Sequence, residues 1–115
     1  MEARALICDE NQRFSVEDVV LPDPGVENVV VKTACSGVSI GTEFALIQNK
    51  ISWGPYPLCT GYQGVGVVEH VGEEVNGFEV GAKVYCRDNK VIELKSGQSV
   101  SAVAGTHCSH AVIDP

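Results

Sequence analysis

Residues 57–72 hold the feature that most constrains the fold, a valine-rich run interrupted by glycines. Valine favours strands because its branched side chain packs well on a pleated surface. Glycine inside a strand leaves room for another backbone or a ligand to approach closely. The run ends near Asn76-Gly77, a strong turn signal, and a second valine-rich strand is predicted over residues 80–84. The stretch therefore predicts two strands, the first of which another backbone or a ligand can approach closely.

Length and charge restrict the class of protein. A chain of 115 residues suffices for one domain, and 44% hydrophobic residues are typical of a globular fold. A net charge of −7 argues against a nucleic-acid partner, because binding a phosphate backbone needs an excess of Lys and Arg. No apolar run approaches the roughly 20 residues of a membrane span, and no apolar leader follows Met1. We therefore expect one cytoplasmic domain with neither a nucleic-acid nor a membrane partner.

The rest of the chain has the pattern of short strands separated by turns. Alternating side chains predict an opening hairpin, and a run apolar on both faces predicts a strand buried on both sides. One short helix is expected over residues 44–48, with Thr42 as its N-cap. The pattern predicts an all-β, partly open barrel with one or two short helices. Besides the glycine-rich run, predicted strands cover residues 4–8, 14–20, 28–34, 80–84, 91–94, 99–104 and 107–113.

The cysteines and histidines do not form a recognisable metal or disulfide pattern. The chain has five cysteines, an odd number, and no Cys-x-x-Cys pair, so neither a disulfide scaffold nor a structural zinc site is expected. We interpret them as free thiols that pack as small apolar groups. In His107-Cys108-Ser109-His110, a strand would place His107 on one face and the other two possible metal ligands, Cys108 and His110, on the opposite face. We therefore expect these histidines to be surface or core residues.

The glycine-rich run continues into a longer pattern. Residues 57–72 read Pro-Leu-x-x-Gly-Tyr-Gln-Gly-Val-Gly-Val-Val-Glu-x-Val-Gly, and residues 75–84 read Val-x-Gly-Phe-x-Val-Gly-x-Lys-Val. With the strand and loop over residues 29–43, this resembles the N-terminal GroES-like catalytic domain of alcohol dehydrogenase-like medium-chain dehydrogenases/reductases. The resemblance covers nearly the whole chain. It implies a GroES-like domain over residues 1–115 and no Rossmann nucleotide-binding domain in the chain.

The resemblance also implies a zinc-independent member. Zinc-dependent members offer a cysteine from the loop after the third strand, a position that falls at Ser39 or Ile40. The His-Glu pair of their glycine-rich core falls at Tyr62 and Gln63. None of these side chains is a competent zinc ligand, so we expect no metal site.

Candidate site residues follow from the same positions. Thr42 matches the threonine that relays a proton in the family, the alternative being a helix N-cap. Tyr62 is a candidate general acid in a metal-free reductase, the alternative being a packed tyrosine with a bonded hydroxyl. Trp53 is either an aromatic lip over a ligand cleft or a loop residue packed on the core. The candidates for substrate binding are Ser39, Glu43, Trp53 and Gln63.

Three functional hypotheses remain. Gly61-x-x-Gly64-x-Gly66 is not a dinucleotide fingerprint, so we expect no cofactor in this chain, and NADP(H) only where a nucleotide-binding domain is supplied. The preferred hypothesis is a small-molecule or protein binding module without catalysis of its own, forming homo-oligomers through an exposed apolar face. The first alternative is the substrate-binding half of an NADP(H)-dependent, zinc-independent oxidoreductase, completed in cis or in trans. The second is a co-chaperonin-like interaction protein, because the barrel shape is shared.

Overall fold

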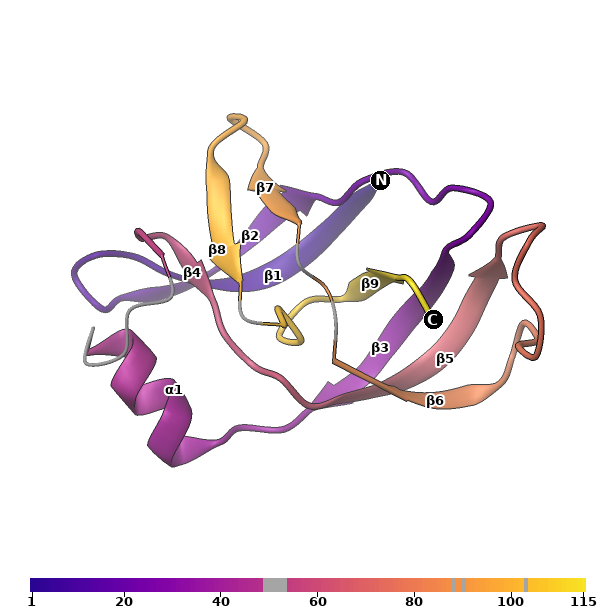
Figure 1. The fold of residues 1–115 in the computed structure, drawn as a ribbon. Coiled ribbons are helices and arrows are strands. Elements are labelled where there is room, and N and C mark those ends of the chain that lie inside the picture. Colours follow the sequence, from indigo (N-terminus) through magenta and orange to yellow (C-terminus); the bar gives the residue numbers. More distant parts are fainter. Residues whose placement is uncertain (49–53, 88, 90, 103) are drawn as a thin grey trace.

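The computed structural model describes residues 1–48, 54–87, 89, 91–102 and 104–115, which form two β-sheets and one helix (Figure 1). The predicted all-β barrel with a short helix is confirmed. No helix in these ranges is both long and apolar enough to span a bilayer. The elements are β1 (Glu2–Cys8), β2 (Phe14–Val20), β3 (Val29–Ser36), α1 (Ile40–Ile47), β4 (Leu58–Cys59), β5 (Gly64–Val71), β6 (Lys83–Cys86), β7 (Ile92–Leu94), β8 (Ser99–Ala102) and β9 (His110–Ile113).

Five strands close into a barrel in the order β1-β2-β7-β8-β4. β1 and β2 form the predicted hairpin, with antiparallel pairing from Glu2↔Val20 to Cys8↔Phe14. The two-residue strand β4 completes the barrel: it runs parallel to β8 and pairs with β1 at Cys8↔Leu58. Closure therefore depends on a very short strand that joins segments far apart in the sequence.

The other four strands form an antiparallel sheet in the order β6-β5-β3-β9. Gly66 of β5 allows a backbone to approach closely, which is one of the two possibilities that the sequence leaves open. A Cβ atom at Gly66 would lie 2.3 Å from the Lys32 carbonyl oxygen and 2.7 Å from Val31 Cγ1. The pairing of β3 with β5 shifts register between Thr33 and Cys35, shortly before β3 ends at Ser36.

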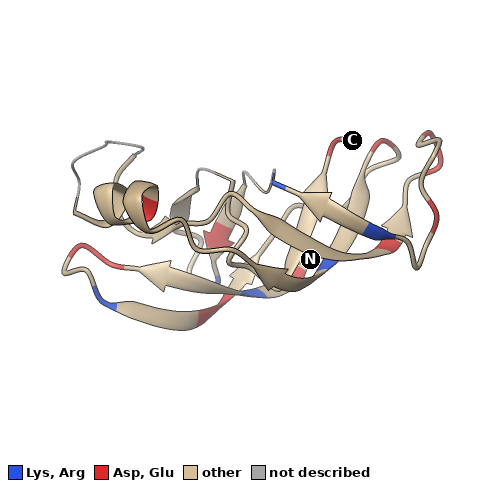
Figure 2. Ribbon diagram, turned by 90° about the horizontal axis from the view of Figure 1, so that it is seen from below, with Lys and Arg blue, Asp and Glu red and all other residues tan. Residues whose placement is uncertain are grey.

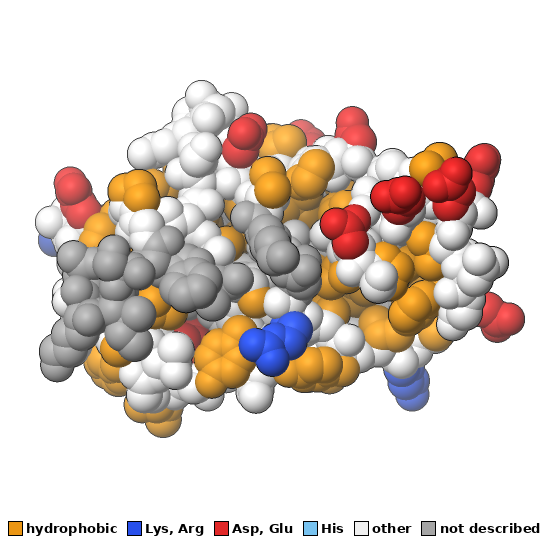
Figure 3. Space-filling view, in the orientation of Figure 1, with side chains coloured by type: hydrophobic (Ala, Val, Ile, Leu, Met, Phe, Trp, Pro, Cys, Tyr) orange, Lys and Arg blue, Asp and Glu red, His pale blue; other side chains and the backbone are white. Residues whose placement is uncertain are grey.

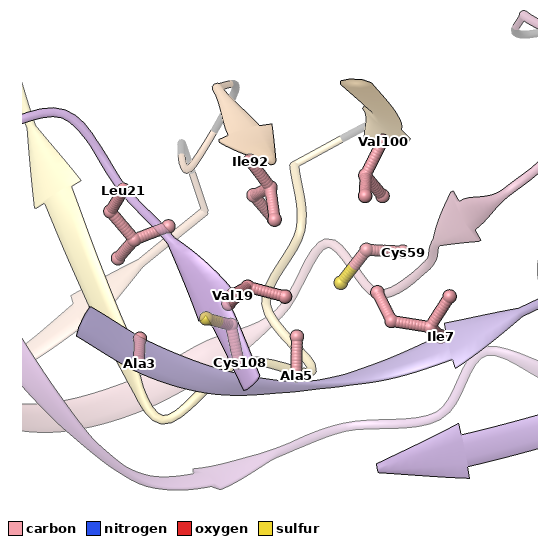
Figure 4. Close-up of a cluster of buried hydrophobic side chains, with 9 residues drawn as sticks. All are labelled: Ala3, Ala5, Ile7, Val19, Leu21, Cys59, Ile92, Val100 and Cys108. Carbon is pink, nitrogen blue, oxygen red and sulfur yellow. The ribbon is translucent and has the colours of Figure 1, made fainter. Parts of the chain in front are cut away.

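Each sheet has its own apolar core. The barrel core brings together side chains from six segments of the chain, which converge in Figure 4. It consists of Ala3, Ala5, Ile7, Val19, Leu21, Cys59, Ile92, Val100 and Cys108. The smaller core of the second sheet consists of Val29, Val31, Val68 and Ala111. Two of the five thiols thus pack inside the barrel, as free cysteines.

Several predicted boundaries are wrong, and the last strand begins at His110 rather than at His107. Helix α1 begins at Ile40 with Ser39 as its N-cap, and Thr42 lies exposed in the first turn. The reason is that the Glu43 carboxylate accepts a hydrogen bond of 2.5 Å from the Ser39 backbone amide, which caps the helix earlier than a cap at Thr42 would. The strand predicted from residue 80 begins at Lys83, because the chain turns through Gly81 with a φ of 92°.

The buried thiols should differ sharply from the exposed one in reactivity. Burial, together with the nearby Cys108 and Glu43, raises the pKa of Cys59 to about 12, whereas Cys35 is exposed. Because the thiolate is the nucleophile, iodoacetamide at neutral pH should modify Cys35 and leave Cys59 intact. Peptide mass spectrometry of the native protein checks this, with denatured protein as the control in which both react. Equal modification of both thiols in the native protein would contradict the expected order.

Candidate functional site

A buried histidine–carboxylate pair lies where helix α1 meets the barrel. His107 Nε2 is 2.6 Å from Glu43 Oε1, and the two side chains are 8% and 6% exposed. Glu43 comes from the first turn of α1 and His107 from the segment between β8 and β9. The pair thus joins residues 64 positions apart in the sequence. Removing one member of such a buried pair leaves the other without its partner, which is costly.

The second ring nitrogen of His107 is also engaged. Its Nδ1 lies 2.6 Å from the Ser36 hydroxyl at the end of β3. When Glu43 is ionised, Nε2–H donates to the carboxylate and Nδ1 accepts from the Ser36 hydroxyl. The arrangement is a serine, a histidine and a glutamate in series.

Predicted site residues extend this cluster. The Tyr62 hydroxyl donates to Ser39 Oγ at 2.6 Å, and the Ser39 backbone amide donates to Glu43. The backbone carbonyl oxygen of Gln63 accepts a hydrogen bond of 2.8 Å from the Gly37 backbone amide. The structure therefore brings Ser39, Glu43 and Tyr62 into one hydrogen-bonded group with Gln63 beside it, while their roles in binding or catalysis stay predictions.

Two further predicted site residues, Thr42 and Trp53, are not part of this group as the structure describes it. Thr42 is exposed in the first turn of α1 and is not among the described residues that line the cleft next to Glu43. Trp53 lies outside the described residues. Ser36 and His107 were not predicted as site residues, because no local spacing links a β3 serine to a histidine 71 residues later. The available signal was Glu43 itself, since a carboxylate that becomes buried needs a partner.

Two clefts meet at His107. The first, called here the apolar cleft, has a volume of about 240 Å³, and its lining includes Glu43 and His107. Its apolar walls are Leu6, Phe14, Val38, Ile40, Phe44 and Ile47. The second, called here the wide cleft, has a volume of about 460 Å³ and is lined by Ser36 and His107 among others. The polar cluster therefore contacts a small apolar space on one side and a larger space on the other.

The donors in this cluster do not fit the family's zinc. Its metal-ligating side chains are one imidazole and one carboxylate, already paired with each other, and the described residues contain no group of three such side chains. The remaining polar groups are hydroxyls, which are weaker ligands than the thiolates and imidazoles that zinc prefers.

The glycine-rich stretch does not fit a nucleotide either. Gly64 and Gly66 lie inside β5, where the space of a missing Cβ is bounded by the carbonyl oxygens of Cys86, at 3.4 Å, and Lys32, at 2.3 Å. A phosphate cradle instead needs glycines that open a helix. Charge agrees with this: Figure 2 shows acidic residues at several turns and only scattered basic residues.

Residues 25–114 match the model of the alcohol dehydrogenase GroES-like domain. The chain therefore belongs to this family, and the GroES-like form predicted from the sequence is confirmed.

The relatives are enzymes several times longer. The chain is 33% identical over 73 residues to acryloyl-coenzyme A reductase of Sulfurisphaera tokodaii, which covers 64% of this chain and 22% of that protein. It is 31% identical over 80 residues to alcohol dehydrogenase B of Mycobacterium tuberculosis, covering 70% and 21%. The chain thus spans about a fifth of the length of the curated relatives it matches.

Solved structures share the fold over almost the whole chain. An alcohol dehydrogenase superfamily protein from Novosphingobium aromaticivorans is similar with a TM-score of 0.71 and 26% identity, covering 99% of this chain and 32% of that one. The cinnamyl alcohol dehydrogenase structure from Sorghum bicolor gives a TM-score of 0.79 at 20% identity, covering 99% and 39%. At that lower identity, the likeness supports the fold alone.

Proposed function

We propose that the chain is the substrate-side domain of a zinc-independent oxidoreductase. Alone it binds a small, largely apolar alcohol or carbonyl compound, and it turns this compound over only with a nucleotide-binding domain and NADP(H). The observation that carries the proposal is the apolar cleft whose lining includes the buried Glu43–His107 pair. Apolar walls with a few convergent polar groups are typical of small-molecule sites.

The size of the relatives supports the requirement for a second domain. The chain spans about a fifth of their length, and they are named as a reductase and a dehydrogenase. Hydride chemistry belongs to the nicotinamide cofactor, so this chain contributes binding and orientation. These properties unite the binding-module hypothesis and the oxidoreductase hypothesis in one account, in which the isolated domain binds and the completed protein reacts.

The chain's own residues have definable tasks in this account. The walls of the apolar cleft exclude water, and hydrogen bonds to a ligand are stronger in such surroundings. The Glu43 carboxylate, which lines the cleft, accepts a hydrogen bond from the ligand hydroxyl. Tyr62, whose hydroxyl lies in the same cluster, remains the proposed proton donor.

An exposed apolar surface on β5 and β6 is the proposed contact for a partner. Val65, Val67 and Tyr85 are 43%, 36% and 58% exposed, and hydrophobic side chains gather over this part of the molecule in Figure 3. Contiguous apolar surface of this kind marks interaction sites. We propose that the nucleotide-binding domain, or a second copy of the chain, covers it.

Ligand titration tests the proposed site. Benzyl alcohol added to the ¹⁵N-labelled chain should shift the amide signals of Val38, Phe44 and His107. Phe44→Ala should weaken the binding several-fold, because it removes an apolar wall of the cleft. Val80→Ala is the matched control, since this valine is 66% exposed and lies elsewhere.

The reaction is tested on the chain joined to the nucleotide-binding domain of a relative. NADPH-dependent reduction of benzaldehyde, slowed several-fold by Phe44→Ala and retained in Val80→Ala, is the expected result. Absence of turnover with nucleotide bound would overturn the oxidoreductase half of the proposal. Benzyl alcohol shifts spread outside the apolar cleft would overturn its binding half.

A further inference from the structure

We propose that Ser36 is a nucleophilic serine that is acylated by activated esters or thioesters of short carboxylic acids, with His107 as its base and Glu43 as the positioning residue. The proposal concerns the wide cleft, whereas the proposed function concerns the apolar cleft. The two claims therefore stand or fall on separate measurements.

The first support is the order and spacing of the three groups. Ser36 Oγ is 2.6 Å from His107 Nδ1, and His107 Nε2 is 2.6 Å from Glu43 Oε1. A nucleophile within hydrogen-bond reach of a base, with that base oriented by a third group, is the recurring signature of covalent catalysis. The ring is turned relative to serine proteases, where Nε2 faces the serine. Either nitrogen of a neutral imidazole can accept a proton while the other carries one.

The second support is that the base is fixed in place. The His107 backbone amide donates to the Thr60 carbonyl oxygen at 3.3 Å, and its own carbonyl oxygen accepts from the Leu6 amide at 2.9 Å. Gly61 packs directly against the ring, so that a Cβ there would lie 2.9 Å from Nε2. With both ring nitrogens bonded and the backbone held on two sides, His107 keeps Nδ1 directed at Ser36.

The third support is access. Ser36 is half-buried and lines the wide cleft together with His107, whereas Glu43 is almost fully enclosed. A carbonyl compound can therefore approach the serine without displacing the carboxylate that orients its base. Leu6, Val16 and Val38 in the same lining suit a short acyl chain.

The reaction balances without a further cofactor. Ser36 Oγ forms a bond to the acyl carbon, and its proton passes to His107 Nδ1. The imidazolium is stabilised by the Glu43 carboxylate. The bond from the acyl carbon to the leaving oxygen or sulfur then breaks, and the leaving group takes the proton from Nδ1. The products are an ester on Ser36 and a free alcohol or thiol, and a water molecule later releases the acid and restores the serine.

The test uses the full chain and p-nitrophenyl acetate, followed by peptide mass spectrometry. The expected result is one acetyl group on Ser36, with acetylation roughly a hundredfold slower in His107→Gln. Ser36→Ala should lose the modified peptide. Ser96→Ala, which changes an exposed serine in the turn between β7 and β8, should keep the rate. Circular dichroism establishes that each variant is folded.

Other results would overturn the proposal. Acetylation confined to lysines, the N-terminus or cysteines would do so, as would equal acetylation of Ser36 in a folded His107→Gln variant. A measurement on the unaltered chain covers the case in which that variant does not fold. Long-range ¹H–¹⁵N spectra should show that His107 carries its proton on Nε2 and none on Nδ1. Protonation at Nδ1 in the neutral ring would exclude it as the base for Ser36. Glu43→Gln should slow acetylation and shift this tautomer balance, which a purely structural carboxylate would not do.

Discussion

Replacing Gly61 by alanine is expected to lower the free energy of unfolding by about 2–5 kcal/mol, from a backbone term of about 1–2 kcal/mol and a packing term of about 1–3 kcal/mol. Gly61 has a φ of 95°, in the left-handed region that disfavours other residues. A Cβ atom there would lie 2.4 Å from Thr106 Oγ1 and 2.9 Å from His107 Cε1 and Nε2. The backbone amides of Thr106 and His107 donate to the carbonyl oxygens of Gly61 and Thr60, so the two residues cannot move away freely. Urea unfolding followed by circular dichroism measures the loss.

Gly77→Ala is the matched control. Gly77 has a φ of 89°, close to that of Gly61, but a Cβ there would meet no atom within 4 Å. Its substitution should therefore cost only the backbone term of about 1–2 kcal/mol. If the two variants lose the same stability, the contact of Gly61 with the His107 ring is not the constraint that we infer.

Replacing Glu43 by alanine should cost about 3–5 kcal/mol, the order of magnitude expected when one member of a buried, hydrogen-bonded pair that contains a charge is removed. The carboxylate accepts from His107 and from the Ser39 backbone amide, and both groups would lose their partner. A domain commonly has a free energy of unfolding of only about 5–15 kcal/mol, so the folded state of this variant should be only marginally stable at 37 °C. The midpoint of urea unfolding, at a constant slope, measures the change.

Thr42→Ala is the control from the same helix turn. Thr42 is exposed and is not the N-cap, so its substitution should change the stability by about 0.5 kcal/mol or less. A loss at Thr42 as large as the loss at Glu43 would show that helix α1 is held by its first turn as a whole rather than by the carboxylate.

Much of the fold was predictable because it is encoded locally. Alternating side chains predicted the β1–β2 hairpin. The glycines of β5 indicated that another group could approach closely, and in the structure this group is the β3 backbone. The start of α1 was not predictable in the same way. Thr42 is a good N-cap by type, but the cap is set by Glu43, whose position depends on a histidine from a distant segment.

The site was predictable only where a family pattern passes through it. That pattern led to Ser39, Glu43 and Tyr62, which the fold brings into one hydrogen-bonded group. It did not lead to Ser36 or His107, which match none of the family positions that we used. Their contact forms because β3 and the segment before β9 meet in three dimensions, so nothing in the spacing of the sequence records it.

The two-residue strand β4 has a consequence for the order of folding. It pairs with residue 8 on one side and with residues 101 and 102 on the other, so barrel closure must wait until three remote segments meet. Contacts between residues far apart in the sequence form slowly, because the chain loses conformational entropy before the stabilising contacts are made. The β1–β2 hairpin, whose strands are neighbours, can form early. On the ribosome, this hairpin will therefore expose the inner face of an unfinished barrel until β7 and β8 have been synthesised.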